Sequence, residues 1–157
     1  MNSIDFSCYD QSETVKWFLD SGSTEHITPL KSDFMQYREF AQMQYAEIAD
    51  GKHLKLEGFG MVIGHSVMPG HTAKIQIQNV LYVPSASKRL YSLIATGQCN
   101  CKSKTMRMGT IVTQSGTPFI IGTPKSGNLH TFDLILIKNW NENVQANIAN
   151  MPSVLRA

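Results

Sequence analysis

The sequence is poor in cysteine and has no long apolar run. Its three cysteines are an odd number, which argues against a disulfide framework and suits a reducing compartment. They do not combine with histidines at the spacing of a zinc site, so we expect no metal and no cofactor. The longest apolar stretches fall well short of the roughly 18 residues that a membrane span requires, so we expect no membrane contact.

Charge of either sign is also sparse. Charged residues make up 17% of the 157, and the formal net charge is +2. Lys and Arg are scattered singly rather than clustered, which predicts that the chain has no nucleic-acid partner. Hydrophobic residues make up 42%, which is enough to form a buried core. The length corresponds to one domain with tails.

Changes in composition divide the chain into three parts. Residues 1–15 are polar and aperiodic, and we interpret them as a flexible leader. Residues 16–138 hold the apolar periodicity and form the predicted domain. Residues 139–157 contain five asparagines and little periodicity, which is typical of a linker tail.

Within the domain, short alternating runs separated by turn residues predict an all-β fold, either a small barrel or a sandwich. Apolar residues at helical spacing predict one short helix within residues 87–98, and residues 29–40 fit either a short helix or a loop. The near-continuous apolar run at residues 129–137 fits a subunit-interface strand or a strand completing the chain's own core. The predicted turns are Asp50-Gly51, Pro69-Gly70 and Ser115-Gly116.

The residues best suited to chemistry are Asp20-Ser21-Gly22. They follow the apolar run Trp17-Phe18-Leu19, and a carboxylate at the end of a buried strand is costly unless it has partners. An ordinary turn is the alternative, because Asp, Ser and Gly are all favoured in turns.

The surrounding segment resembles the active site of retropepsins, most closely that of copia-type retrotransposon polyproteins. Further blocks of that family follow in the same order over residues 17–138. The blocks are Trp17-Phe18-Leu19-Asp20-Ser21-Gly22-Ser23-Thr24-Glu25-His26, Ile48-Ala49-Asp50-Gly51, Gly58-Phe59-Gly60, Asn79-Val80-Leu81-Tyr82-Val83-Pro84 and Lys88-Arg89-Leu90-Tyr91-Ser92-Leu93.

The resemblance implies a small closed β-barrel of retropepsin type with one short helix. It also implies an aspartic endopeptidase that processes its own Gag-Pol polyprotein as a homodimer, in a cytoplasmic virus-like particle. Asp20 of each subunit would share one proton with its counterpart and activate a water. Ser21 would tie the two loops together across the two-fold axis, and Gly22 would allow close backbone approach.

For substrate binding, the resemblance implicates Ser23, whose hydroxyl could donate to the Asp20 carboxylate. It also implicates Ala49, Asp50 and Gly51 as a mobile flap, with Gly58-Phe59-Gly60 and the Pro69-Gly70 turn as rivals for that role. His26 is either a brace or proton donor near the active loop, or an ordinary structural histidine.

The chain also departs from the retroviral pattern, in which two apolar residues and a glycine lie before the helix. Tyr82-Val83-Pro84 stands there instead, and Ile120-Ile121-Gly122 comes about forty residues too late. Two other functions therefore remain open. One is a catalytically inactive or domesticated β-barrel that binds proteins, and the other, favoured least by the charge, is a nucleic-acid-binding barrel.

Overall fold

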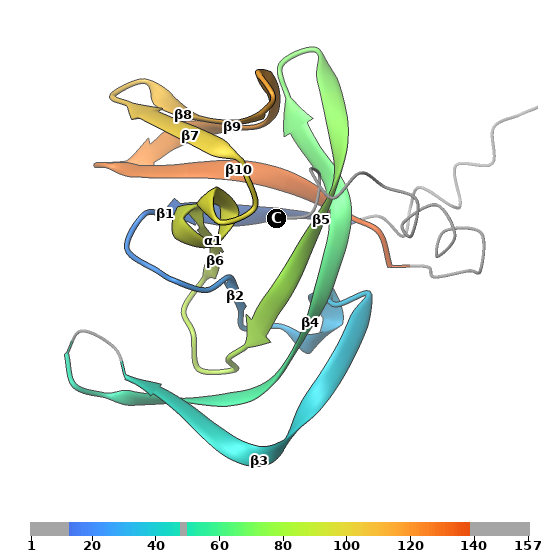
Figure 1. Ribbon diagram of the computed structural model, residues 1–157, viewed down its shortest axis with the longest axis vertical. Coiled ribbons are helices and arrows are strands. Elements are labelled where there is room, and N and C mark those ends of the chain that lie inside the picture. The colour runs from blue at the N-terminus through green and yellow to red at the C-terminus, as the bar shows by residue number, and fades with distance from the viewer. Residues whose placement is uncertain (1–12, 48–49, 139–157) are drawn as a thin grey trace, which may run out of the picture.

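The computed structural model describes residues 13–47 and 50–138 as an all-β structure with one short α-helix (Figure 1). Its elements follow in chain order: β1 Glu13–Asp20, β2 Ile27–Thr28, the 3₁₀ turn η2 Lys31–Asp33, β3 Gln36–Glu47, β4 His53–Met68, β5 His71–Tyr82, β6 Arg89–Ser92, α1 Leu93–Gly97, β7 Lys102–Met106, β8 Gly109–Gln114, β9 Thr117–Ser126 and β10 Leu129–Leu136.

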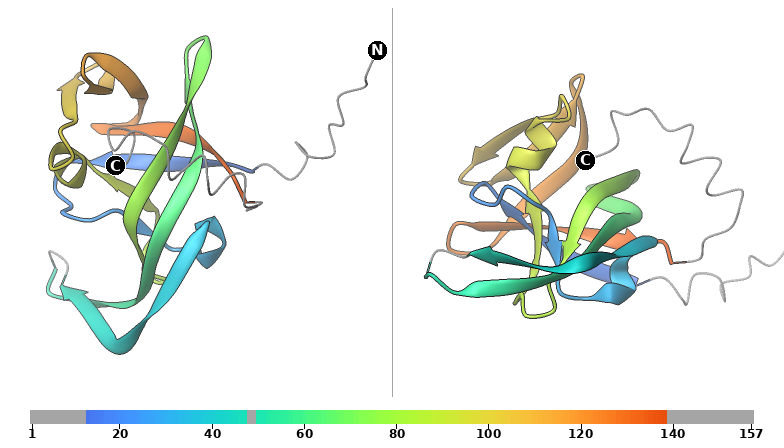
Figure 2. Two further views of the ribbon diagram at one scale, coloured as in Figure 1. Left: turned by 45° about the vertical axis from the view of Figure 1, so that its right-hand side comes forward. Right: turned by 60° about the horizontal axis from the view of Figure 1, so that its bottom comes forward.

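Six strands close into a small barrel. The pairing runs β4, β5, β2, β6, β1 and β10, and β10 then pairs with β4 to complete the ring. Closure removes the open sheet edges within the ring. β3 extends the barrel beyond β4 as an outer ribbon, and β9, β8 and β7 form a three-stranded sheet attached along β10 (Figure 2). The predicted all-β barrel with one short helix is confirmed.

Alternation of side chains along the strands fills the barrel. In β1 every second residue points inward, and Trp17 is fully buried. The same cluster takes residues from β4, β5, β8, β9 and β10, so one apolar core joins the barrel to the attached sheet. Its largest members include Trp17, Tyr91, Ile75, Ile77, Ile120, Phe132 and Leu134.

The three predicted hairpin turns are confirmed. Asp50-Gly51 lies between β3 and β4, Pro69-Gly70 between β4 and β5, and Ser115-Gly116 between β8 and β9. Gly51, Gly70 and Gly116 all have φ near +80°, a conformation that glycine adopts without steric cost.

Three local predictions need correction. The helix is limited to α1, because Arg89 to Ser92 form strand β6, where pairing with β1 overrides the helical spacing. Residues 29–40 contain only the 3₁₀ turn η2 before β3 starts at Gln36. β1 begins at Glu13, so the strand includes the last residues of the expected leader. The predicted tail, residues 139–157, lies outside the described residues.

The strand at residues 129–137 completes the chain's own fold rather than an interface. β10 pairs with β1 along one edge and with β9 and then β4 along the other. Phe132, Leu134 and Leu136 are buried within the single chain. The near-continuous apolar run therefore reflects burial inside one subunit.

The block Gly58-Phe59-Gly60 lies inside β4, which excludes it as a flap turn. The glycines let β3 cross β4 closely: a Cβ at Gly60 would collide with the Gln36 carbonyl oxygen and Phe34, and one at Gly58 would collide with Tyr37 and the Arg38 carbonyl. Phe59 between them stacks on Phe40 of β3, with ring centroids 5.3 Å apart. The motif is thus a packing device for the β3–β4 ribbon.

We predict that Gly60→Ala destabilises the fold strongly. The added methyl would push β3 away from β4, which should cost about 2–3 kcal/mol and lower Tm by roughly 10 °C. Gly97→Ala is the matched control, because a Cβ there meets nothing within 4 Å. Equal melting temperatures for the two variants in a thermal unfolding assay would contradict this account of the motif.

Candidate functional site

The candidate site forms where two parallel strands end together. β1 and β6 lie side by side in parallel, and the register places Asp20 opposite Ser92. After Asp20 the chain turns into an exposed loop, and after Ser92 it enters α1. β6 also pairs with β2 on its other side, so it lies between the strands that precede and follow the loop.

Backbone amides of its own loop hold the Asp20 carboxylate. Gly22 N–H donates to Asp20 Oδ1 at 2.7 Å, and Ser23 N–H donates to the same oxygen at 3.3 Å. Asp20 is half-buried, and within the described residues its Oδ2 accepts no hydrogen bond. One carboxylate oxygen is thus fixed by the loop and the other is available to a partner or substrate.

The structure brings Asp20, Ser21, Gly22 and Ser23 into this one loop. Ser21 and Gly22 are exposed, and a Cβ at Gly22 would come only within 3.4 Å of Asp20 Oδ1. The Ser23 hydroxyl donates to the Glu25 carbonyl at 2.7 Å, so its backbone amide, rather than the expected hydroxyl, contacts Asp20.

A buried serine on β6 anchors the loop. Ser92 is fully buried, and its hydroxyl donates to the Ser23 carbonyl at 2.5 Å while accepting from Ala95 N–H at 2.9 Å. The Ser92 carbonyl accepts from the Thr96 hydroxyl at 2.9 Å. Ser92 therefore joins the Asp20 loop, strand β6 and helix α1, for which it is also the N-cap.

His26, which directly precedes β2, supports the end of β6 at Ser92. It is 1% exposed, and its Nδ1 accepts from the Ser92 N–H at 2.9 Å. Its ring packs against Tyr91 with centroids 4.7 Å apart. Burial lowers the pKa of His26 from 6.5 to about 4, so the ring is neutral near pH 7. Of the roles considered for His26, these contacts fit a hydrogen-bond brace near the Asp20 loop better than a proton donor.

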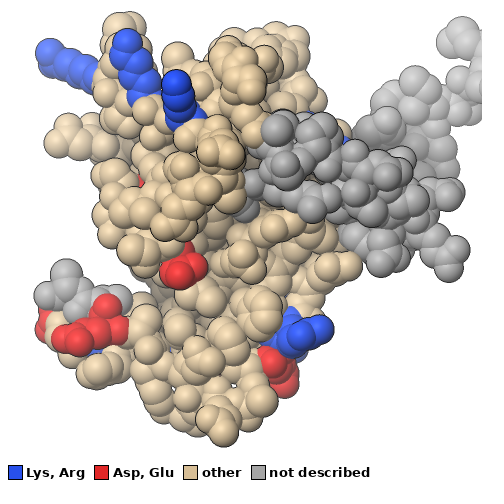
Figure 3. Space-filling model, in the orientation of Figure 1, with Lys and Arg blue, Asp and Glu red and all other residues tan. Residues whose placement is uncertain are grey.

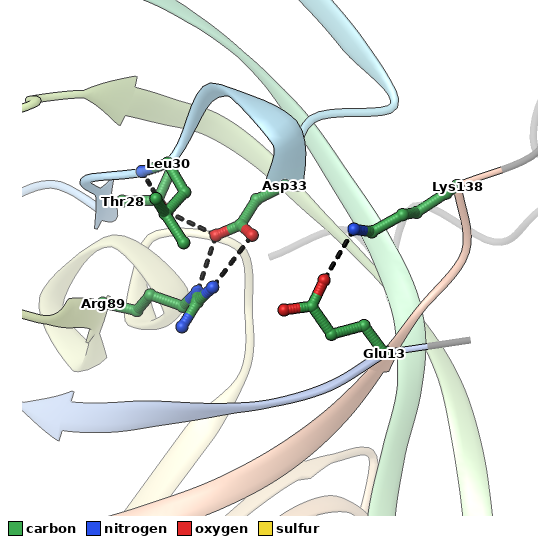
Figure 4. A network of polar contacts seen from close by, with 6 residues as sticks. All are labelled: Glu13, Thr28, Leu30, Asp33, Arg89 and Lys138. Atoms are coloured by element: carbon green, nitrogen blue, oxygen red, sulfur yellow. Dashed lines mark hydrogen bonds and ion pairs between the residues drawn. The ribbon is translucent and has the colours of Figure 1, made fainter. Parts of the chain in front are cut away.

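An ion pair holds the other end of β6 (Figure 4). Arg89 Nε donates to Asp33 Oδ2 at 2.6 Å, and Arg89 Nη2 donates to Oδ1 at 3.0 Å. Thr28 Oγ1 donates to Asp33 Oδ2 at 2.5 Å. The Asp33 side chain is only 1% exposed, so this two-pronged pair fixes β6 against β2 and the η2 turn.

A second ion pair visible in Figure 4 joins the two ends of the described fold. Lys138 Nζ lies 2.6 Å from Glu13 Oε2, and this contact lowers the pKa of Glu13. The pair is largely exposed to solvent, so it contributes little to stability.

Asp50 and Gly51 lie between the paired strands β3 and β4, at the tip of their ribbon. Ala49, the third predicted residue of this group, lies outside the described residues. Figures 1 and 2 show the ribbon tip on the same side of the molecule as the loop between β1 and β2. The ribbon carries an open groove of about 250 Å³, lined by residues that include Phe40, Met43 and Leu56.

Three residues that support the site were not identified as site residues from the sequence. Ser92 carried a usable signal, since a serine just before a helical run is a typical N-cap. Asp33 and Arg89 are 56 positions apart and gave no local signal. Among the described residues, no three His, Cys, Asp or Glu side chains gather in a metal-binding group, and no helix is long and apolar enough to span a membrane.

The chain matches a known protein family. A family model described as the beta-barrel domain of the Pol polyprotein matches residues 17–114, more than half of the chain. The matched segment runs from β1 to the end of β8, so it includes the Asp20 loop, the β3–β4 ribbon, β6 and α1. No curated protein matches the chain.

We predict that His26 sets a pH limit on stability. Its pKa is about 4 in the folded chain and 6.5 unfolded, so the unfolded state takes up a proton first as the pH falls. Stability present above pH 6.5 is therefore lost as the pH falls toward 4, by about 3 kcal/mol in total from this residue. Urea titrations between pH 7 and 4 measure it.

His26→Asn is the informative variant, because the amide oxygen can still accept the Ser92 N–H and does not titrate. The unfolding free energy of the parent should fall by about 3 kcal/mol relative to that of the variant as the pH falls from 7 to 4. Parallel pH profiles for the two proteins would show that His26 is not the titrating group.

Proposed function

The chain belongs to the family of Pol polyprotein beta-barrel domains, and we propose that it is the aspartic protease of a copia-type retrotransposon polyprotein, active as a homodimer. The observation that carries the proposal is the Asp20-Ser21-Gly22 loop, which β6 supports through Ser92 at the end of β1. Its substrates would be extended apolar segments of its own Gag-Pol polyprotein, cut in a cytoplasmic virus-like particle.

The position of β6 supports this resemblance. Retroviral enzymes have two apolar residues and a glycine before their helix. In the sequence, Tyr82-Val83-Pro84 was the segment expected at the position of these three residues. In the fold the strand before α1 is β6, which ends in Leu90, Tyr91 and Ser92. Two apolar residues are thus in place, and a buried serine stands where those enzymes have glycine.

The chemistry would need two copies of the loop. Two carboxylates held close together cannot both ionise, so the pair keeps one proton between them. The ionised Asp20 takes a proton from water, whose oxygen bonds to the peptide carbonyl carbon. The protonated Asp20 of the other subunit then gives its proton to the leaving nitrogen as the C–N bond breaks.

Within one chain the loop has polar groups that could contact a second copy of the loop. The Asp20 Oδ2 atom and the exposed Ser21 side chain have no hydrogen-bond partner among the described residues. A two-fold axis beside this loop would bring a second Asp20 to the first. The β3–β4 ribbon, with Asp50 and Gly51 at its tip, would act as the flap, a role also predicted for Ala49.

Asp20→Asn is expected to abolish cleavage of a precursor that contains this chain and its flanking sequence. The amide is nearly isosteric but cannot take the proton from water, so the rate should fall by about three orders of magnitude or more. Asp133→Asn is the control, because Asp133 pairs with Lys16 on the barrel wall. Cleavage by Asp20→Asn at a tenth of the parent rate would refute the catalytic assignment.

Mixing experiments test the dimer. When parent chains are mixed with a nine-fold excess of Asp20→Asn chains, random pairing leaves about a tenth of the parent chains with a parent partner. Activity per parent chain should therefore fall about ten-fold. The same excess of Asp133→Asn chains, which keep the triplet, should raise total activity instead.

A monomer whose specific activity is independent of concentration would contradict the two-subunit mechanism. A folded monomer or dimer without cleavage would favour the alternative of a barrel kept only for protein binding.

A further inference from the structure

The sheet of β7, β8 and β9 is positively charged, and no acidic residue in the same stretch of sequence neutralises it. Residues 93–128 contain four Lys or Arg residues and no Asp or Glu. All four are exposed, and within the described residues none forms an ion pair. They are Lys102, Lys104, Arg107 and Lys125.

Strand register puts Lys102 and Lys104 on one face of the sheet. Lys102 and Lys104 lie opposite Thr113 and Ile111, and directly opposite residues share a face of the sheet. The other face of β8 is the buried one, formed by Thr110, Val112 and Gln114.

On β9, Ile121 lies opposite Ile111, and alternation places Thr123 on the same outer side. Lys125 follows on β9 as an exposed residue, at the register shift between β9 and β10. Arg107 occupies the turn between β7 and β8. We call this outer surface, with its four cations, the basic face.

Acidic residues gather elsewhere. In Figure 3 basic side chains project from the upper part of the molecule, where Figure 1 places β7 and β8, and most acidic atoms on this side lie lower. On the β3–β4 ribbon, by contrast, Lys52 and Lys55 are close to Asp50 and Glu57. Along the sequence Lys125 stands 18 positions after Arg107, so the sequence alone did not show that all four cations belong to one sheet.

We propose that the basic face binds the phosphate backbone of single-stranded nucleic acid. The cations are spread over two outer strands and a turn, with Lys102 and Lys104 about 7 Å apart along β7. Thr113 and Thr123 add hydroxyl groups of the kind that contact phosphates. No carboxylate in residues 93–128 would repel the ligand.

An acidic peptide fits the face less well. A strand added along the open edge of β7 would reach Lys102 and Lys104 but would lie away from Lys125 on β9. Peptide recognition also uses pockets for alternate side chains, and the groove described above lies on the β3–β4 ribbon. The face carries no aromatic side chain, so binding should be independent of base sequence and governed by salt.

The test is fluorescence anisotropy of the full chain with a labelled twelve-nucleotide oligouridine at several salt concentrations. Four phosphate contacts predict a slope of about −3 for log K against log salt. The triple variant Lys102→Gln, Lys104→Gln, Lys125→Gln should bind roughly ten-fold more weakly or worse at low salt, with a slope near −1.

The matched control is Lys31→Gln, Lys52→Gln, Lys55→Gln, which removes the same charge from lysines that lie beside carboxylates. It should bind like the parent, and equal loss in both variants would reduce the effect to net charge and overturn the proposal. A twelve-residue polyglutamate that binds as tightly as the RNA would assign the face to acidic peptides instead. Asp20→Asn should bind RNA normally, so this test is independent of proteolysis.

Discussion

The buried hydroxyl of Ser92 is the contact on which the candidate site depends. It lies where β1 and β6 end side by side, and it donates to the carbonyl of Ser23 while accepting from the first turn of α1. A polar side chain with no exposure is stable only when its hydrogen bonds are made, so the hydroxyl specifies one arrangement of loop and helix. The barrel therefore positions the Asp20 loop through Ser92 of β6, while the other side of the loop is exposed.

The supports around Ser92 are polar as well, and they act at both ends of β6. His26 accepts the Ser92 amide at one end, and Asp33 binds Arg89 at the other. Removing one partner of a buried ion pair costs about 3–5 kcal/mol, because the remaining charge stays buried without compensation. These two directional contacts lie at opposite ends of the four-residue strand β6, so both favour the same register. The cost is sensitivity to acid, since His26 has to stay neutral.

Sequence reasoning reached the parts of the fold that local patterns determine. Alternation and turn chemistry predicted the strands and the hairpins at Asp50-Gly51, Pro69-Gly70 and Ser115-Gly116. It failed where distant segments decide the outcome. Leu90 has helical spacing but lies in β6, because pairing with Phe18 of β1 outweighs local preference. The contacts between Asp33 and Arg89, and between His26 and Ser92, join residues 56 and 66 positions apart and exist only once the barrel closes.

The Asp20 loop has groups that have no structural role within the described residues of one chain. Gly22 has no positive φ, and a methyl group there would only touch Asp20 Oδ1 at 3.4 Å, so nothing within the described chain requires glycine. Ser21 is exposed without a partner, and Asp20 Oδ2 is unbonded within the same residues. A loop that β6 fixes on one side, and that has groups without hydrogen-bond partners on its exposed side, is suited to binding a second protein surface. A two-fold copy of the same loop would use all three groups at once, which is the physical reason to prefer a dimer over an inert turn.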